Sequence, residues 1–110
     1  MRGRARDRWG LPRGVVDIVI DICIDYDRRR LCIETKSVRE DVRACYERLN
    51  SAIDEALLHA EPIVRQDLFT DIKTRRGYAY SPASTYMCKS AYYARKRKVI
   101  YAVAEALMLT

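Results

Sequence analysis

The sequence predicts a small all-α bundle, and three observations support this fold class. Apolar residues recur at helical spacing over four turns within residues 37–60. Pro62 and Gly77 stand where one helix would start and stop, because Pro suits a first turn and Gly tolerates the left-handed backbone that ends many helices. Residues 90–109 join a basic run to an almost wholly apolar end. A chain of 110 residues can bury one core, so we expect a single domain.

The segment 15–26, VVDIVIDICIDY, is compatible with two structures. Its β-branched residues recur at a period of two, which is typical of a strand. This interpretation gives an α+β fold with an N-terminal β-hairpin at about 15–35. The same residues also form an apolar stripe at helical spacing from Val15 to Tyr26. We expect the helix, because twelve residues is long for a strand and no partner strand follows.

Three carboxylates, Asp17, Asp21 and Asp25, follow one another at helical spacing in this segment. Such a face can bind a hard cation. No second acidic cluster accompanies it, and three arginines follow at residues 28–30. We therefore interpret these carboxylates as a solvated face of the helix.

The four cysteines lack CxxC spacing, and the single histidine, His59, has no nucleophile partner in view. Cys23 and Cys45 sit among apolar neighbours, as small core residues do. We expect reduced thiols, no metal, no cofactor and no catalytic residue.

Residues 37–60 give the clearest helix of the chain. Ser37 and Glu40 have the spacing of a capping box, in which the two side chains satisfy each other's backbone amides. The residues that we expect on the buried face share apolar character and helical spacing: Val42, Cys45, Tyr46, Leu49, Ile53, Ala56 and Leu57.

The next helix should begin at Pro62 and end near Gly77, with Ile63 or Val64 and then Leu68, Phe69 and Ile72 on its buried face. A tight connection over residues 78–87 should contain one short turn beginning at Ser81-Pro82. We expect Ser90 to be the N-cap of a last helix that runs to about Leu109.

Positive charge is concentrated in residues 73–98. This stretch holds eight Lys or Arg and no acid, although the whole chain has a formal net charge of only +6, and it holds five of the eight tyrosines. Lys and Arg neutralise phosphates, and Tyr hydroxyls can bond to phosphate oxygens, so the pattern favours a nucleic-acid partner. Residues 1–10 are also Arg-rich, and we expect a basic flexible arm there, followed by a single helical domain over 11–110.

A helix, a glycine-bearing turn and a helix with a basic leading end predict a helix-turn-helix at about 62–109. In this motif the leading end of the second helix enters the major groove of DNA. The predicted DNA-binding residues are polar or basic and lie in that leading end or at the end of the preceding helix: Lys89, Ser90, Tyr92 and Arg95 or Lys96 toward the bases, and Arg97, Lys98, Arg75 and Arg76 toward phosphates.

The stretch 89–107, KSAYYARKRKVIYAVAEAL, resembles the C-terminal helix of small phage-encoded transcriptional regulators of the ArpU and RinA type. The shared pattern is a cap with Ser and Lys, a Tyr-Tyr pair, a basic run and an Ala-rich apolar end. The front of the chain, with Gly10-Leu-Pro and then Asp25-Tyr-Asp-Arg28, is also similar to that family. The resemblance implies an all-helical fold like region four of sigma factors and a role in regulating phage or prophage genes.

Two functions are therefore considered. The first is a phage- or prophage-type transcriptional regulator, not an enzyme, that binds double-stranded DNA through the basic half of the last helix. The alternative is a small phage protein-interaction module that docks on host polymerase or another complex. For a regulator of this kind, RNA polymerase is a further expected partner. The apolar end at 99–110 suggests a homodimer. No apolar run is long enough to span a membrane, so we expect a cytoplasmic protein, and the resemblance implies that it acts in a bacterial host cell.

Overall fold

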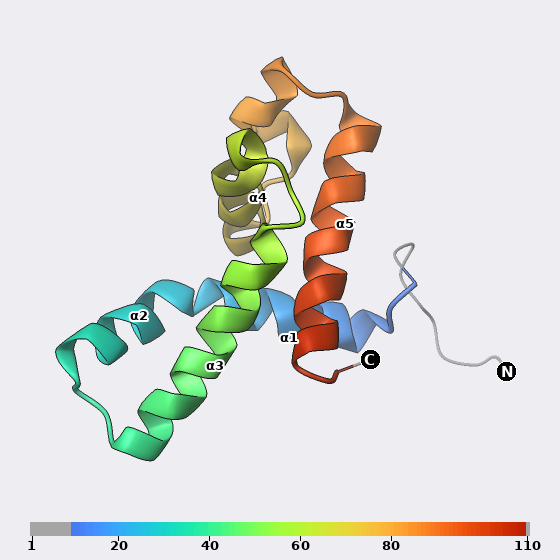
Figure 1. Cartoon of the computed structure of the whole chain (residues 1–110). Helices are drawn as coiled ribbons and strands as arrows, with labels where there is room; N and C mark the ends of the chain where they lie inside the picture. The colour runs from blue at the N-terminus through green and yellow to red at the C-terminus, as the bar shows by residue number, and fades with distance from the viewer. Residues whose placement is uncertain (1–9, 110) are drawn as a thin grey trace, which may run out of the picture.

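The structure, a computed structural model, describes residues 10–109, which form five α-helices with two short 3-10 helices between the last two (Figure 1). The predicted all-α class is confirmed. The alternative fold with a β-hairpin at 15–35 is not supported, because residues 10–109 form no β-strand. The predicted basic arm at 1–10 lies, except for Gly10, outside the described residues.

The ambiguous segment is helix α1 (Arg13–Ile24). Val16, Val19 and Cys23 lie three and four residues apart and are buried, and α1 packs against α4 and α5. Two of the carboxylates between them, Asp17 and Asp21, are exposed. The helix forms because its one apolar face has partners in the fold, whereas an isolated strand would have none.

Helix α1 ends at Asp25, whose backbone turns the chain into helix α2 (Tyr26–Thr35). A buried arginine holds this corner. Arg29 donates hydrogen bonds to the Asn50 side chain at 2.7 Å and to the Ile22 carbonyl at 2.5 Å. Asn50 in turn donates to the Tyr26 carbonyl at 3.2 Å. These bonds satisfy the polar groups that the corner buries.

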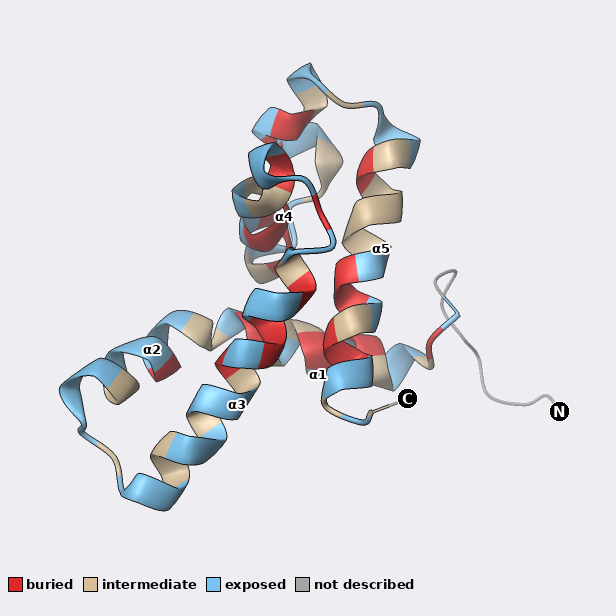
Figure 2. Ribbon diagram, viewed as in Figure 1, coloured by how far each residue is buried: buried red, intermediate tan, exposed pale blue. Residues whose placement is uncertain are grey.

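Helix α2 and helix α3 (Glu40–Leu57) form an antiparallel hairpin that projects from the body of the protein (Figure 1). Most of α2 and the first half of α3 are exposed or half-buried (Figure 2). The predicted buried face of α3 is therefore right only near its C-terminal end, where Ile53 and Ala56 are buried. The expectation that Cys45 is a core residue is wrong, since it is exposed, whereas Cys23 is buried as expected.

The predicted capping box at Ser37 is wrong. Lys36 adopts a left-handed conformation, and the Ser37 amide donates to the Cys32 carbonyl at 3.2 Å to close α2. This is the backbone pattern of a Schellman motif. Because the Ser37 amide ends one helix, Glu40 cannot use it to begin another, and the N-cap of α3 is Arg39 without a side-chain cap.

Helix α4 (Pro62–Thr74) begins at Pro62 as predicted, and Val64 rather than Ile63 is buried. It ends earlier than predicted, because Arg75 takes the left-handed position that we expected at Gly77. Gly77 also has a positive φ, of 92°. The connection then forms two 3-10 helices, Tyr78–Tyr80 and Pro82–Thr85, and the second starts at the predicted Ser81-Pro82.

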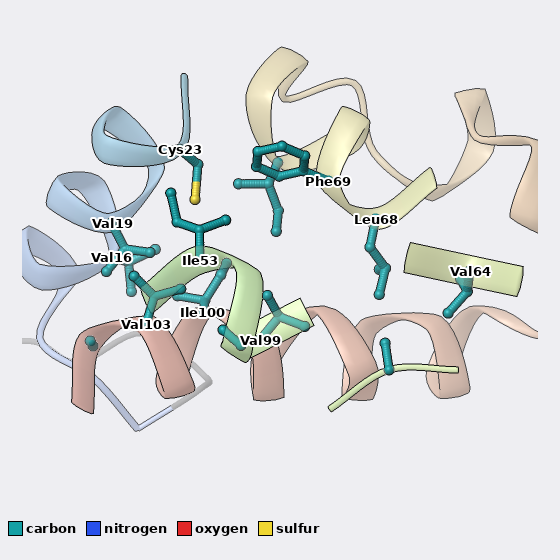
Figure 3. Packing of buried hydrophobic residues seen from close by; sticks show 14 of the residues in the cluster. Val16, Val19, Cys23, Ile53, Val64, Leu68, Phe69, Val99, Ile100 and Val103 are labelled. Atoms are coloured by element: carbon teal, nitrogen blue, oxygen red, sulfur yellow. The ribbon is translucent and has the colours of Figure 1, made fainter. Parts of the chain in front are cut away.

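Helix α5 (Lys89–Ala106) has Cys88 as its N-cap, so the prediction that Ser90 is the cap is wrong, and the helix ends three residues before Leu109. The hydrophobic core lies where α1, α3, α4 and α5 meet (Figure 3). Its labelled side chains come from all four helices: Val16, Val19, Cys23, Ile53, Val64, Leu68, Phe69, Val99, Ile100 and Val103.

Candidate nucleic-acid interface

The connection between α4 and α5 is held by buried and partly buried polar contacts and is much longer than the turn of a simple helix-turn-helix. It spans residues 75–88. The Tyr78 hydroxyl donates to the Met87 carbonyl at 2.5 Å, and the Tyr78 amide donates to the Tyr93 hydroxyl at 3.2 Å. The Ser81 side chain accepts from the Ala83 amide at 3.2 Å. The bond to Tyr93 joins the connection to the leading end of α5, and the other two bonds hold the connection itself.

A buried carboxylate on α4 anchors α5. Asp71 accepts hydrogen bonds from the Tyr92 hydroxyl at 2.5 Å, from the Lys96 ammonium at 3.2 Å and from the Gly77 amide at 2.8 Å. The Asp71 side chain is 2% exposed and that of Lys96 is 12% exposed. Burial, followed by the bond to Asp71, raises the pKa of Tyr92, so this hydroxyl stays protonated as a donor.

A second ion pair joins α5 to the corner between α3 and α4. The Arg95 guanidinium donates to both carboxylate oxygens of Glu61, at 3.0 and 2.8 Å. These bonds lower the pKa of Glu61 to about 2, so the carboxylate stays ionised at neutral pH. Arg95 and Glu61 remain open to solvent, with side chains 34% and 48% exposed.

Three predicted base-reading residues thus bind partners within the same chain. Tyr92 is completely buried, so the prediction that it reads DNA bases is wrong. Lys96 is largely buried on Asp71, and Arg95 is occupied by Glu61. The reason is geometric: Tyr92, Lys96 and Val99 share the face of α5 that turns toward α4 and the core.

The remaining predicted residues stay accessible. Lys89, Ser90 and Lys98 are exposed on α5, and Arg97 is half-buried. Ser90 and Arg97, seven residues apart, share the outward face of the helix. Within residues 10–109, none of the cations Lys89, Arg97 and Lys98 has a carboxylate oxygen within 4.0 Å.

The two arginines at the start of the connection are both exposed. Arg75 lies 3.9 Å from Asp17 of α1, a distance at which an exposed pair contributes little. Arg76 has no ion pair within the described part of the chain, and it precedes Gly77, which lies beside the Tyr93 hydroxyl of α5. Tyr93 is half-buried, with the Lys96 ammonium 5.6 Å from its ring centre.

Sequence reasoning missed the anchoring role of Asp71. A signal was present: Asp71 follows Val64 by seven residues and Leu68 by three, so it belongs to the apolar stripe of α4. A lone carboxylate on such a stripe needs a buried donor. Which donor meets it depends on how α5 packs, and local spacing does not contain that information.

Comparison of the chain with family models, with curated proteins and with solved structures gives no match. No helix among residues 10–109 has the length and apolar character that a membrane span requires. In the same residues no group of three or more His, Cys, Asp and Glu side chains is placed to hold a metal ion.

Proposed function

We propose that the chain is a transcriptional regulator of phage or prophage type that binds double-stranded DNA through the outward face of the leading half of α5. The observation that carries this proposal is the set of accessible cations there, Lys89, Arg97 and Lys98, which have no acidic partner in the described part of the chain. Residues 89–104 of the sequence contain no acid. Such a surface attracts phosphates strongly.

The anchors of α5 support this role, because a reading helix must be held rigidly to dock in one register. Lys96 and Arg95 tie α5 to α4 and to the α3–α4 corner, on two sides of the helix. The proposed docking then places Lys89 and Ser90, in the first turn, toward base edges. Arg97, Lys98 and Arg76 neutralise phosphates on either side.

The test compares two double variants that remove equal charge. Lys89→Ala with Arg97→Ala removes two proposed contacts. The control, Arg30→Ala with Arg48→Ala, removes two exposed arginines from the projecting α2–α3 hairpin. Binding to a duplex from the region upstream of the gene and to a random duplex is measured by electrophoretic shift at several salt concentrations.

The proposal predicts that the unchanged protein prefers the upstream duplex and that its affinity for this duplex falls steeply as the salt concentration rises. The first double variant should flatten the slope of log affinity against log salt by about 1, because Arg97 is the phosphate contact that it removes and each such contact contributes about 0.9. The control should keep the original slope. Absence of binding at low salt would contradict the proposal and would favour the alternative, a module that docks on host polymerase or another acidic protein surface.

This proposal implies action in the cytoplasm of a bacterial host, with RNA polymerase as a second partner. The sequence argument for a homodimer loses its basis, however. The main apolar side chains at the end of α5, Val99, Ile100 and Val103, are buried within the same chain. Of the large apolar residues in that end, Tyr101 and Met108 are the exposed ones.

A further inference from the structure

An open groove of about 850 Å³ lies between the corner that joins α3 to α4 and the middle of α5. Residues 58–62 and Arg65 form one side, and residues 94–101 contribute the other. The groove is separate from the first turn of α5, where Lys89 and Ser90 lie. Its volume falls within the range of sites that bind small molecules or short segments.

The charge of the groove is strongly positive. Arg65, Arg95, Arg97 and Lys98 line it, and Glu61 is the single carboxylate among its lining residues. Arg95 binds that carboxylate in a two-bond ion pair. Both side chains of the pair are partly open to solvent, so a ligand carboxylate can exchange with that of Glu61.

Arg65 is positioned by the end of α3. Its Nε donates to the carbonyls of Leu57 and Ala60 at 3.0 and 2.9 Å, which fixes the guanidinium at the groove. No other bond of this guanidinium is found in residues 10–109. The two terminal nitrogens therefore retain donors for a ligand.

Apolar side chains border the same groove on both sides. Leu58, at the end of α3, is 65% exposed, and Tyr101 of α5 is 43% exposed. Ala60, Pro62 and Ala94 continue the apolar lining. A ligand that fits this groove must therefore combine negative charge with apolar groups.

We propose that the groove binds an acidic peptide segment of a protein partner, with Leu or Phe side chains set among Asp and Glu. The apolar side chains of the segment pack on Leu58 and Tyr101, and its carboxylates bind Arg65, Arg97 and Lys98. One ligand carboxylate replaces Glu61 on Arg95. The groove shares Arg97 and Lys98 with the proposed DNA contacts. The inference does not rest on DNA binding, because Arg65, Leu58 and Tyr101 belong to the groove alone.

The groove favours a peptide over a nucleic acid for two reasons. A phosphate backbone has no apolar group that could pack on Leu58 at one rim or on Tyr101 at the other. Both side chains would therefore stay exposed in a complex with nucleic acid. The cations also line a concave site, whereas duplex contacts in helix-turn-helix proteins come from a helix that projects into a groove of the DNA.

The test is a titration of the ¹⁵N-labelled full-length protein, followed by amide chemical shifts. The probe is a 12-residue peptide that alternates Asp or Glu with Leu or Phe. In one control peptide Ser replaces Leu and Phe, and in another Asn and Gln replace Asp and Glu. The proposal expects saturable shifts at Leu58, Ala60, Ala94 and Tyr101, and binding at least about tenfold weaker for either control peptide.

Three protein variants sharpen the result. Leu58→Ser with Tyr101→Ser should weaken binding of the probe peptide about tenfold. If this double variant loses helicity, Leu58→Ser is measured alone. Glu61→Gln should strengthen binding roughly two- to fivefold, since it removes the competing carboxylate. Glu34→Gln makes the same change of charge on exposed α2 and should leave the affinity unchanged.

Several outcomes would overturn the proposal. One is the absence of saturable shifts, and another is shifts that map away from the groove. If the variant Leu58→Ser with Tyr101→Ser binds the probe peptide as tightly as the unchanged protein does, charge attraction alone accounts for the binding. A DNA oligonucleotide could instead shift the same amide resonances, with binding that requires Leu58 and Tyr101, while the peptide causes no such shifts. The groove would then belong to a nucleic-acid interface.

Discussion

The Tyr92 hydroxyl donates a hydrogen bond of 2.5 Å to the carboxylate of Asp71, and this bond joins α5 to α4 inside the core. Tyr92 is completely buried, and Asp71 is nearly so. Lys96 of α5 also reaches the same carboxylate at 3.2 Å. One acidic side chain on α4 therefore binds two residues on the inner face of α5 and withdraws Lys96 from the accessible cations.

The first prediction concerns this bond. Tyr92→Phe keeps the ring in the core and removes only the hydroxyl, so Asp71 loses one of its donors. We expect a loss of about 1.5–3 kcal/mol in the free energy of unfolding, the usual range for a hydrogen bond to a charged group. Chemical denaturation followed by circular dichroism measures it.

Tyr80→Phe is the matched control, because Tyr80 is 76% exposed. It should change the stability by less than about 0.5 kcal/mol. Equal effects of the two substitutions would show that the Tyr92–Asp71 bond does not stabilise the packing of α5.

The second prediction compares two neighbouring arginines at the start of α2. Arg29 has a side chain only 4% exposed and bonds to Asn50 and to the Ile22 carbonyl. Arg29→Met leaves those acceptors buried without a donor, so we expect a loss of about 3 kcal/mol. The measurement is again the free energy of unfolding.

Arg28→Met removes the same charge from the neighbouring position. Arg28 makes a two-bond pair with Asp25 at 2.8 and 2.5 Å, which lowers the pKa of Asp25, but its side chain is 55% exposed. An exposed pair contributes little to stability, so we expect a smaller loss than from Arg29→Met. A larger loss from Arg28→Met than from Arg29→Met would contradict the role of Arg29 as the support of the α1–α2 corner.

Much of the fold could be predicted because its determinants are local. Pro62 marked the start of α4, and the apolar spacing of Val64, Leu68 and Ile72 marked its buried face. Helix ends were predicted less well. Ser37 and Ser90 both have cap chemistry, yet neither caps a helix, because the backbone amide of Ser37 closes α2 and α5 begins one residue before Ser90.

The candidate site was predicted only in outline. The concentration of charge in 73–98 correctly located the accessible cations of α5. The sequence did not distinguish Arg97, which is accessible, from Lys96, which is buried on Asp71. That distinction depends on carboxylates from other helices, 25 residues away for Lys96 and 34 for Arg95. Charge reversal at Lys96 would therefore test the fold more than the interface.

The third prediction concerns the buried face of α3. Ile53 is completely buried in the core, whereas Leu49, one turn earlier, is only half-buried. Ile53→Ala should cost about 2–5 kcal/mol, because the substitution leaves a cavity among packed side chains. Leu49→Ala should cost less than half as much, since solvent already reaches its site. Equal losses in denaturation experiments would place the core farther along the projecting hairpin than the structure does.

The last prediction follows the ion pair between Glu61 and Arg95 as pH falls. The bonds from Arg95 depress the pKa of Glu61 from its ordinary 4.5 to about 2. A depressed carboxyl pKa contributes stability that is present above pH 4.5 and is lost as the pH falls toward 2. The side-chain resonances of Glu61 should therefore titrate with a midpoint near 2 in the unchanged protein.

Arg95→Gln should move the Glu61 midpoint upward toward 4.5, because the main cause of the depression is removed. Arg97→Gln removes the same charge from a neighbour that has no carboxylate within 4.0 Å in residues 10–109, and it should leave the midpoint near 2. If both variants move the midpoint equally, the general positive potential of the groove, rather than the bonds from Arg95, holds Glu61 ionised. In that case the whole groove would hold the charge of Glu61. An acidic ligand would then not displace the Glu61 carboxylate from Arg95 in particular.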